Sequence, residues 1–191
     1  MSSNVDIASN ALQMLGAKAI NSFDDPGAGA AAAKALYEPL LTALLTNTYW
    51  RFAIKKASLN LLSQTPLNEW KYAFQIPTDN LKIEKAYHLR SYQIYQNFLY
   101  ANQNSVEIDY VYRVPESLFP SYFELAFTYK LVSEFALAVT DDANKNQLYE
   151  QKFRLALADA MAADAQQHPQ FAIQDQPFTD VRFGGFSGDW I

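Results

Sequence analysis

The residues that could do acid–base chemistry are two pairs of adjacent carboxylates, Asp24-Asp25 and Asp141-Asp142. Two carboxylates at one site can divide the work of a general acid and a general base. Both pairs, however, lie where a helix is expected to begin. At that position a carboxylate accepts hydrogen bonds from free backbone N–H groups and interacts favourably with the helix dipole. We therefore interpret both pairs as helix caps.

Histidine and cysteine chemistry is sparsely represented, because the sequence has two histidines, His88 and His168, and no cysteine. A serine triad needs a histidine beside a serine and an orienting acid, and a zinc site needs several ligands at suitable spacing. Neither histidine has a second ligand at helical spacing, so we interpret both as surface or edge residues. The absence of cysteine excludes disulfides and thiolate catalysis. We expect no catalytic residue, no cofactor and no metal, and hence no enzyme.

A glycine-rich segment lies at residues 182–191, RFGGFSGDWI, and contains three of the six glycines. A phosphate-binding loop would lie between a strand and a helix, with a lysine after the glycines, and this segment has neither feature. Exposed aromatic side chains are costly without a partner, whereas glycines allow tight bends between aromatic anchors. We predict a docking tail whose contact residues are Arg182, Phe183, Phe186, Trp190 and Ile191.

Basic residues alternate with aromatic ones in WRFAIKKA (50–57) and LKIEKAYHLR (81–90). Such a patch could bind single-stranded nucleic acid, with the bases stacked on the rings. The other interpretation is a sheet face with outward-pointing lysines. The net charge of −5 argues against a general nucleic-acid binder, whose affinity would come from phosphate neutralisation. A nucleic-acid-binding module therefore stays an alternative, with these contact residues: Lys55, Lys56, Lys82, Lys85 and Arg90.

Helical spacing of apolar residues predicts two helices within residues 1–49 and two within 115–167. Ser3 and Asp6 form a capping box for the first helix. The second is expected to start at Asp25-Pro26 and to continue past Pro39 with a kink. The third is apolar on two sides, which indicates burial on more than one side. In the last helix the residues that share an apolar face are Tyr149, Phe153, Ala156, Ala160 and Ala163.

Residues 50–114 change to a period of two, most clearly in EWKYAFQI (69–76) and VEIDYVYRV (106–114). With three weaker runs, at residues 51–62, 80–87 and 91–100, these segments predict five short strands in an antiparallel meander or small barrel. Ten of the twelve tyrosines lie between Tyr49 and Tyr129, which suits a half-buried sheet. After residue 168 the periodicity is lost.

The predicted fold class is α+β and predominantly helical: a four-helix bundle, made of two N-terminal and two C-terminal helices, with an inserted small antiparallel β-lobe. The expected domains are 1–49, 50–114, 115–167 and an extended docking tail at 168–191. No run of about 18 uncharged apolar residues predicts a membrane span. The first residues lack the basic and apolar regions of a signal peptide, so secretion by a cleaved signal is not expected.

Four segments resemble the tail tubular protein A family, the head-to-tail adaptors of short-tailed bacteriophages. They are IASNALQMLG…RFAIKKASL (7–59), WKYAFQIPTDNLKI (70–83), VEIDYVYRV (106–114) and FELAFTYKLV…ADAMAADAQ (123–166). The first is similar to the family's short helix, acidic loop and long helix, and the last to its returning helical hairpin. The resemblance covers essentially the whole chain in architecture.

The resemblance implies a dodecameric ring beneath the portal protein, extending a channel through which DNA passes as cargo. It also implies a platform for the tail nozzle (tail tubular protein B) and the tail fibres, and a C-terminal tail that reaches along the portal. The protein would then be located in the virion tail after assembly in the bacterial host cytoplasm. No catalysis is required for this role. A virion-associated cell-wall hydrolase and the nucleic-acid-binding module are the alternatives.

Overall fold

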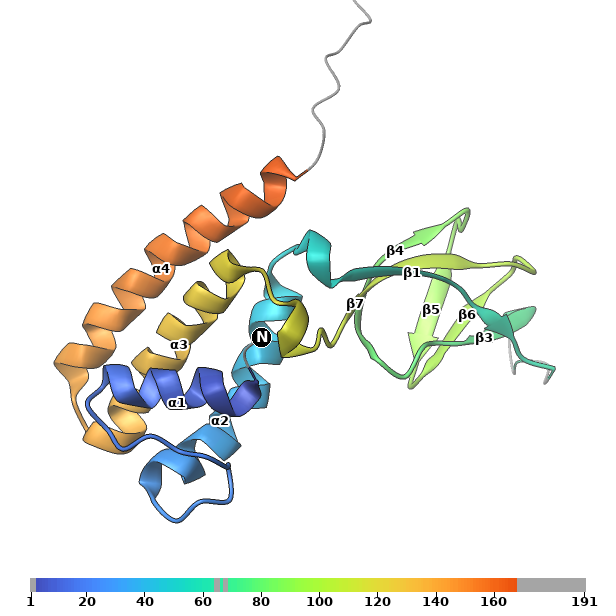
Figure 1. The fold of residues 1–191 in the computed structure, drawn as a ribbon. Coiled ribbons are helices and arrows are strands. Elements are labelled where there is room, and N and C mark those ends of the chain that lie inside the picture. Colours follow the sequence, from blue (N-terminus) through green and yellow to red (C-terminus); the bar gives the residue numbers. More distant parts are fainter. Residues whose placement is uncertain (1–2, 64–65, 67–68, 168–191) are drawn as a thin grey trace, which may run out of the picture.

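The computed structural model describes residues 3–63, 66 and 69–167, and Figure 1 shows their arrangement, with the helices on one side and the strands on the other. The helices are α1 (Asn4–Met14), α2 (Ala28–Asn47), α3 (Ser121–Thr140) and α4 (Ala143–Gln166), with two 3-10 turns, η1 (Arg51–Ala53) and η2 (Glu116–Leu118). The strands are β1 (Ile54–Ser58), β2 (Asn60–Leu61), β3 (Tyr72–Gln75), β4 (Asn80–Tyr87), β5 (Tyr92–Tyr95), β6 (Phe98–Ala101) and β7 (Glu107–Tyr112).

Helix α1 begins with the predicted capping box, which is confirmed. The Ser3 hydroxyl accepts a hydrogen bond from the Asp6 backbone N–H at 3.1 Å, and the Asp6 carboxylate accepts one from the Ser3 backbone N–H at 2.8 Å. The prediction that α2 continues past Pro39 is also confirmed, because the helix runs on to Asn47. These local signals depend on neighbouring residues only, so they can be recognised in the sequence.

The predicted start of α2 at Asp25-Pro26 is wrong. The residue before the helix is Gly27, whose φ of 136° favours glycine, and it makes no side-chain cap. The Asp25 carboxylate instead accepts hydrogen bonds from the backbone N–H groups of Asn21, at 2.7 Å, and Ser22, at 3.2 Å. Asp25 therefore stabilises the loop before α2.

Helix α3 lies at the centre of the helical part and contacts α1, α2 and α4. This position explains its two apolar stripes, because α3 buries side chains on several sides: Phe123, Ala126, Phe127, Leu131, Val132, Phe135 and Ala136. Tyr37 of α2 packs edge-on against Phe127, with ring centroids 5.2 Å apart. Helix α4 runs alongside α3, and its opposite side is exposed (Figure 1).

The strands form two antiparallel sheets, one with the order β1-β7-β4 and the other with the order β2-β3-β6-β5. Only Leu59 separates β1 from β2, so the chain passes from one sheet to the other at this residue. Between the sheets lies a second core, distinct from the helical one, and its buried side chains are Leu59, Phe74, Ile76, Leu99, Ala101, Val106, Ile108 and Tyr110.

The expected fold class, a four-helix bundle with an inserted small β-lobe, is therefore wrong. The residues that the structure describes form four α-helices and two sheets with seven strands in all. The run expected as one strand near residues 91–100 is a hairpin, β5 and β6, that turns at Gln96 with a φ of 54°. The run at 51–62 divides into η1, β1 and β2. The additional strands provide two facing sheets, each of which buries one face against the other.

Among the helices that the structure describes, none is both long and apolar enough to cross a membrane.

Candidate functional site

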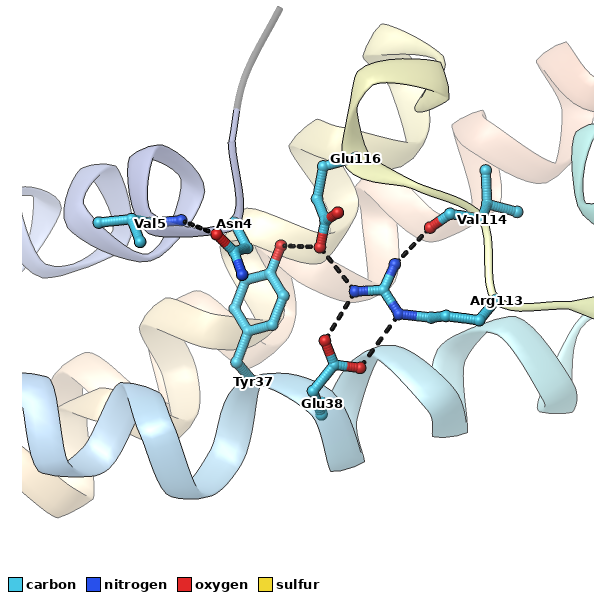
Figure 2. Close-up of polar contacts among 7 residues, drawn as sticks. All are labelled: Asn4, Val5, Tyr37, Glu38, Arg113, Val114 and Glu116. Carbon is cyan, nitrogen blue, oxygen red and sulfur yellow. Dashed lines mark hydrogen bonds and ion pairs between the residues drawn. The ribbon is translucent and has the colours of Figure 1, made fainter. Parts of the chain in front are cut away.

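The chain crosses between the helices and the sheets after β7, and the side chain of Arg113, the next residue, binds α2 and η2 at this crossing (Figure 2). Its guanidinium makes a bidentate contact with the Glu38 carboxylate of α2, at 2.7 and 3.0 Å. It also donates to the Glu116 carboxylate of η2 at 2.6 Å and to the Val114 backbone carbonyl. The Tyr37 hydroxyl donates to the same Glu116 oxygen at 3.2 Å. We call this set the Arg113 cluster.

The charges of the Arg113 cluster favour fixed protonation states. Burial raises the pKa of Tyr37 well above its ordinary value, and the neighbouring Glu116 carboxylate raises it further. Burial alone would lower the pKa of Arg113, but the hydrogen bonds that its guanidinium donates to Glu38 and Glu116 outweigh burial and hold this pKa above its ordinary value. A neutral phenol and a permanent cation do not exchange protons near neutral pH, so the cluster is suited to joining elements and not to acid–base catalysis.

A second polar cluster joins the end of α4 to the start of α3 and to η1. The Asp164 side chain is buried, with 2% of its residue surface exposed. Its carboxylate accepts one hydrogen bond from the Arg51 backbone N–H and one from the Tyr122 hydroxyl, both at 2.9 Å. The Gln167 amide donates to the Tyr122 oxygen at 3.1 Å. Burial, and then the hydrogen bond to Asp164, raises the pKa of Tyr122 to about 12. This cluster therefore holds the C-terminal end of α4 against the start of α3 and η1.

The predicted face of α4 packs against the helical core, and the opposite face is exposed. Exposed residues recur there at alternating intervals of three and four: Leu148, Gln151, Leu155, Ala158, Ala162 and Ala165. We call this set the outer α4 face. Leu155 is 71% exposed and Leu148 is 49% exposed. This spacing is the one with which a helix packs along another helix. The regular interval is visible in the sequence, although packing is predicted only for the opposite face, at Tyr149 and Phe153.

The acidic pairs have structural roles. Asp142 is the N-cap of α4, where its carboxylate accepts from the backbone N–H groups of Asn144 and Lys145, both at 3.0 Å, so the capping interpretation is confirmed for this residue. Asp141 ends α3 in the left-handed conformation. Asp24 does not cap a helix: its carboxylate accepts from the Lys34 ammonium at 2.6 Å.

His88 is exposed and follows β4 directly, with a φ of 60°, which confirms its interpretation as a surface residue. His168 lies outside the described residues. Among residues 3–63, 66 and 69–167, no group of three His, Cys, Asp or Glu side chains could hold a metal ion. The predicted docking residues, Arg182, Phe183, Phe186, Trp190 and Ile191, also lie outside the described residues.

Most of the lysines considered for nucleic-acid binding lie beside carboxylates. Lys55 contacts Asp79 at 2.8 Å, Lys82 contacts Glu84 at 2.7 Å, and Lys56 lies 3.8 Å from Asp109. Lys85 lies over the Tyr87 ring, 4.6 Å from its centroid. Arg90 follows β4 and is exposed. Three of these four lysines therefore lie near negative charges, and the contacts of Lys55 and Lys56 join residues that are far apart in the sequence.

No protein-family model matches this chain, and no curated protein sequence matches it significantly. The resemblance to the tail tubular protein A family therefore stays a prediction.

Replacing Arg113 by lysine should lower the free energy of unfolding by about 1–3 kcal/mol, because an ammonium cannot reproduce the bidentate contact and leaves Glu116 with fewer donors. Urea denaturation measures the change. The matched control is Lys34→Met, which removes the exposed pair with Asp24 and should leave stability nearly unchanged. Equal effects of the two substitutions would contradict the role of the Arg113 cluster.

Replacing Tyr122 by phenylalanine should cost stability in a pH-dependent way. The fold raises the pKa of Tyr122 from 10.0 to about 12 because it favours the neutral phenol. This contribution is fully present below pH 10 and is lost as the pH rises through 12. The difference in free energy of unfolding between the two proteins should therefore narrow over that range. A difference that stays constant with pH would show that the hydroxyl acts only by packing.

Proposed function

We propose that this chain is a structural head-to-tail adaptor of the tail tubular protein A kind, acting in the virion tail of a short-tailed bacteriophage. It assembles as a ring beneath the portal protein, extends the DNA channel, and forms a platform for the tail nozzle and the tail fibres. The observation that carries this proposal is the outer α4 face, an exposed surface that includes two leucines and three alanines at regular helical spacing.

The outer α4 face supports assembly because exposed apolar side chains at regular helical spacing need a packing partner. Leu155 is exposed over 71% of its surface, and three of the other positions in the set are alanines, which let a neighbouring backbone approach closely. A subunit in a ring contacts two neighbours through two different surfaces. Further exposed apolar side chains on the helical side of the molecule are Met14, Leu118, Leu125 and Leu137.

The sheets offer a separate surface that suits a platform. Strand β5 lies at the edge of its sheet, pairs only with β6, and is exposed along its whole length. Its outward residues include Tyr92, Ile94 and Tyr95, which are 40%, 44% and 55% exposed. Tyrosine combines apolar area with a polar hydroxyl, and it is enriched where proteins bind one another. Helix α4 and strand β5 lie on opposite sides of the molecule in Figure 1, so partners can bind the outer α4 face and the β5 edge at the same time.

The double substitution Leu148→Glu/Leu155→Glu should abolish ring formation on the portal, because it replaces both leucines of the outer α4 face by charged side chains. The thermal midpoint of the isolated chain should stay close to that of the unsubstituted protein, since both side chains are exposed. Analytical ultracentrifugation of each protein with portal rings measures assembly. The matched control, Asn104→Glu/Ser105→Glu, adds the same charge at an exposed turn between β6 and β7. Rings from the leucine variant would contradict the proposal.

Deleting residues 182–191 should leave the fold intact and weaken attachment to the portal. The segment carries the aromatic anchors Phe183, Phe186 and Trp190, and alanine substitution of an anchor typically costs more than 1 kcal/mol of binding. Surface plasmon resonance on immobilised portal measures the affinity, and circular dichroism confirms the fold. Equal affinities of the truncated and full-length chains would refute the docking role of this segment.

A further inference from the structure

The outer face of the β1-β7-β4 sheet carries a charged pocket. Strand register aligns Lys56 and Lys85 on either side of Asp109, and Ser58 and Tyr87 on either side of Glu107. These six side chains share one face because residues opposite each other in neighbouring strands point the same way. On the other face, Ile108 points into the core between the sheets. The pocket has a volume of about 350 Å³ and is open to solvent.

Asp109 is the centre of this pocket and has one carboxylate oxygen without a donor. Its Oδ2 atom accepts a short hydrogen bond from the Tyr87 hydroxyl at 2.6 Å. Its Oδ1 atom is buried and makes no hydrogen bond. The nearest cation is the Lys56 ammonium at 3.8 Å, which is an ion-pair distance and too long for a hydrogen bond. A buried charged oxygen without a donor is unfavourable, so the pocket favours a ligand that supplies one.

We propose that this pocket binds an arginine side chain presented by a partner protein. The guanidinium would donate to Asp109 Oδ1 and to the Glu107 carboxylate, and its plane would lie against the Tyr87 ring. Asp109 and Glu107 are two residues apart on one strand, a spacing of about 6.5 Å, and a guanidinium can reach both carboxylates with N–H groups on different edges. The site lies on the sheets, away from the outer α4 face, and does not depend on ring assembly.

The geometry of the pocket favours a guanidinium over other charged groups. The Lys56 ammonium already lies beside Asp109, but it does not come within hydrogen-bond distance of Oδ1. A planar guanidinium offers five N–H donors in a fixed fork and stacks on an aromatic face. An anion would meet the Asp109 and Glu107 carboxylates, whereas a guanidinium has to displace the Lys56 ammonium from its place beside Asp109. The Lys56 side chain is 78% exposed, so it can move aside at little cost. The Tyr87 ring already attracts cations, with the Lys85 ammonium 4.6 Å and the Lys56 ammonium 5.6 Å from its centroid, and a guanidinium would take the place of Lys56 there.

The test is a nuclear magnetic resonance titration of the full chain with two blocked peptides, Ac-Gly-Arg-Gly-NH2 and Ac-Gly-Lys-Gly-NH2. The arginine peptide should bind saturably, with shifts centred on Tyr87, Glu107 and Asp109, and about tenfold more tightly than the lysine peptide. Asp109→Asn should lower the affinity by at least about tenfold. Glu107→Gln, at an exposed position, should weaken binding without any risk to the fold. Lys56→Ala should instead tighten binding by about threefold, because it removes the competing cation.

The control is Asp24→Asn, which removes an exposed carboxylate far along the chain and should bind the arginine peptide as the unsubstituted protein does. Equal affinities for the two peptides would overturn the proposal. So would the absence of saturable shifts at millimolar concentrations, or unchanged binding in both Asp109→Asn and Glu107→Gln. A chain that binds the arginine peptide and forms no ring would keep this site and reject the adaptor role, so the two failures are distinguishable.

Discussion

The helices and the sheets of this protein are held in one arrangement by the two places where the chain crosses between them. At the first crossing, Trp50 is fully buried, donates to the Leu44 carbonyl at 2.9 Å, and packs edge-on against Phe123 with ring centroids 5.1 Å apart. At the second, the Arg113 guanidinium binds Glu38 of α2 and Glu116 of η2. One crossing relies on aromatic packing and the other on a charged network. Because the Trp50 contacts and the Arg113 ion pairs form in the same fold, they restrict how the helices and the sheets can lie relative to each other.

Much of the local structure could be predicted from the sequence, because it depends on adjacent residues. The Ser3 capping box, the continuation of α2 past Pro39 and the Asp142 cap are examples. The fold class could not, because the strand count depends on turns with weak signals. The β5–β6 hairpin turns at Gln96 without a glycine, and β1 and β2 are parted by a single residue, Leu59. Each was therefore interpreted as one continuous strand, and the second sheet was missed.

The functional surfaces also differ in whether they can be recognised in the sequence. The outer α4 face has a regular interval, so its residues could have been found by considering both sides of the helix. The Arg113 cluster could not, because Arg113 and Glu38 are 75 residues apart and only folding brings them together. Lys55 and Lys56 likewise meet Asp79 and Asp109 only in the fold, whereas Lys82 and Glu84 are two residues apart in β4. These pairings give the sheets a mixed pattern of positive and negative charges. The sheets therefore do not present a continuous basic surface.

The proposed adaptor role depends on assembly, because a ring buries apolar helix surface that the single chain exposes. Native mass spectrometry of the full chain mixed with portal rings from the same phage tests this claim most directly, since it counts the copies bound. The account predicts a discrete ring-sized complex with a fixed number of chains on each portal, and little assembly without the portal. The absence of any such complex at all mixing ratios, with a folded chain and intact portal rings, would contradict it.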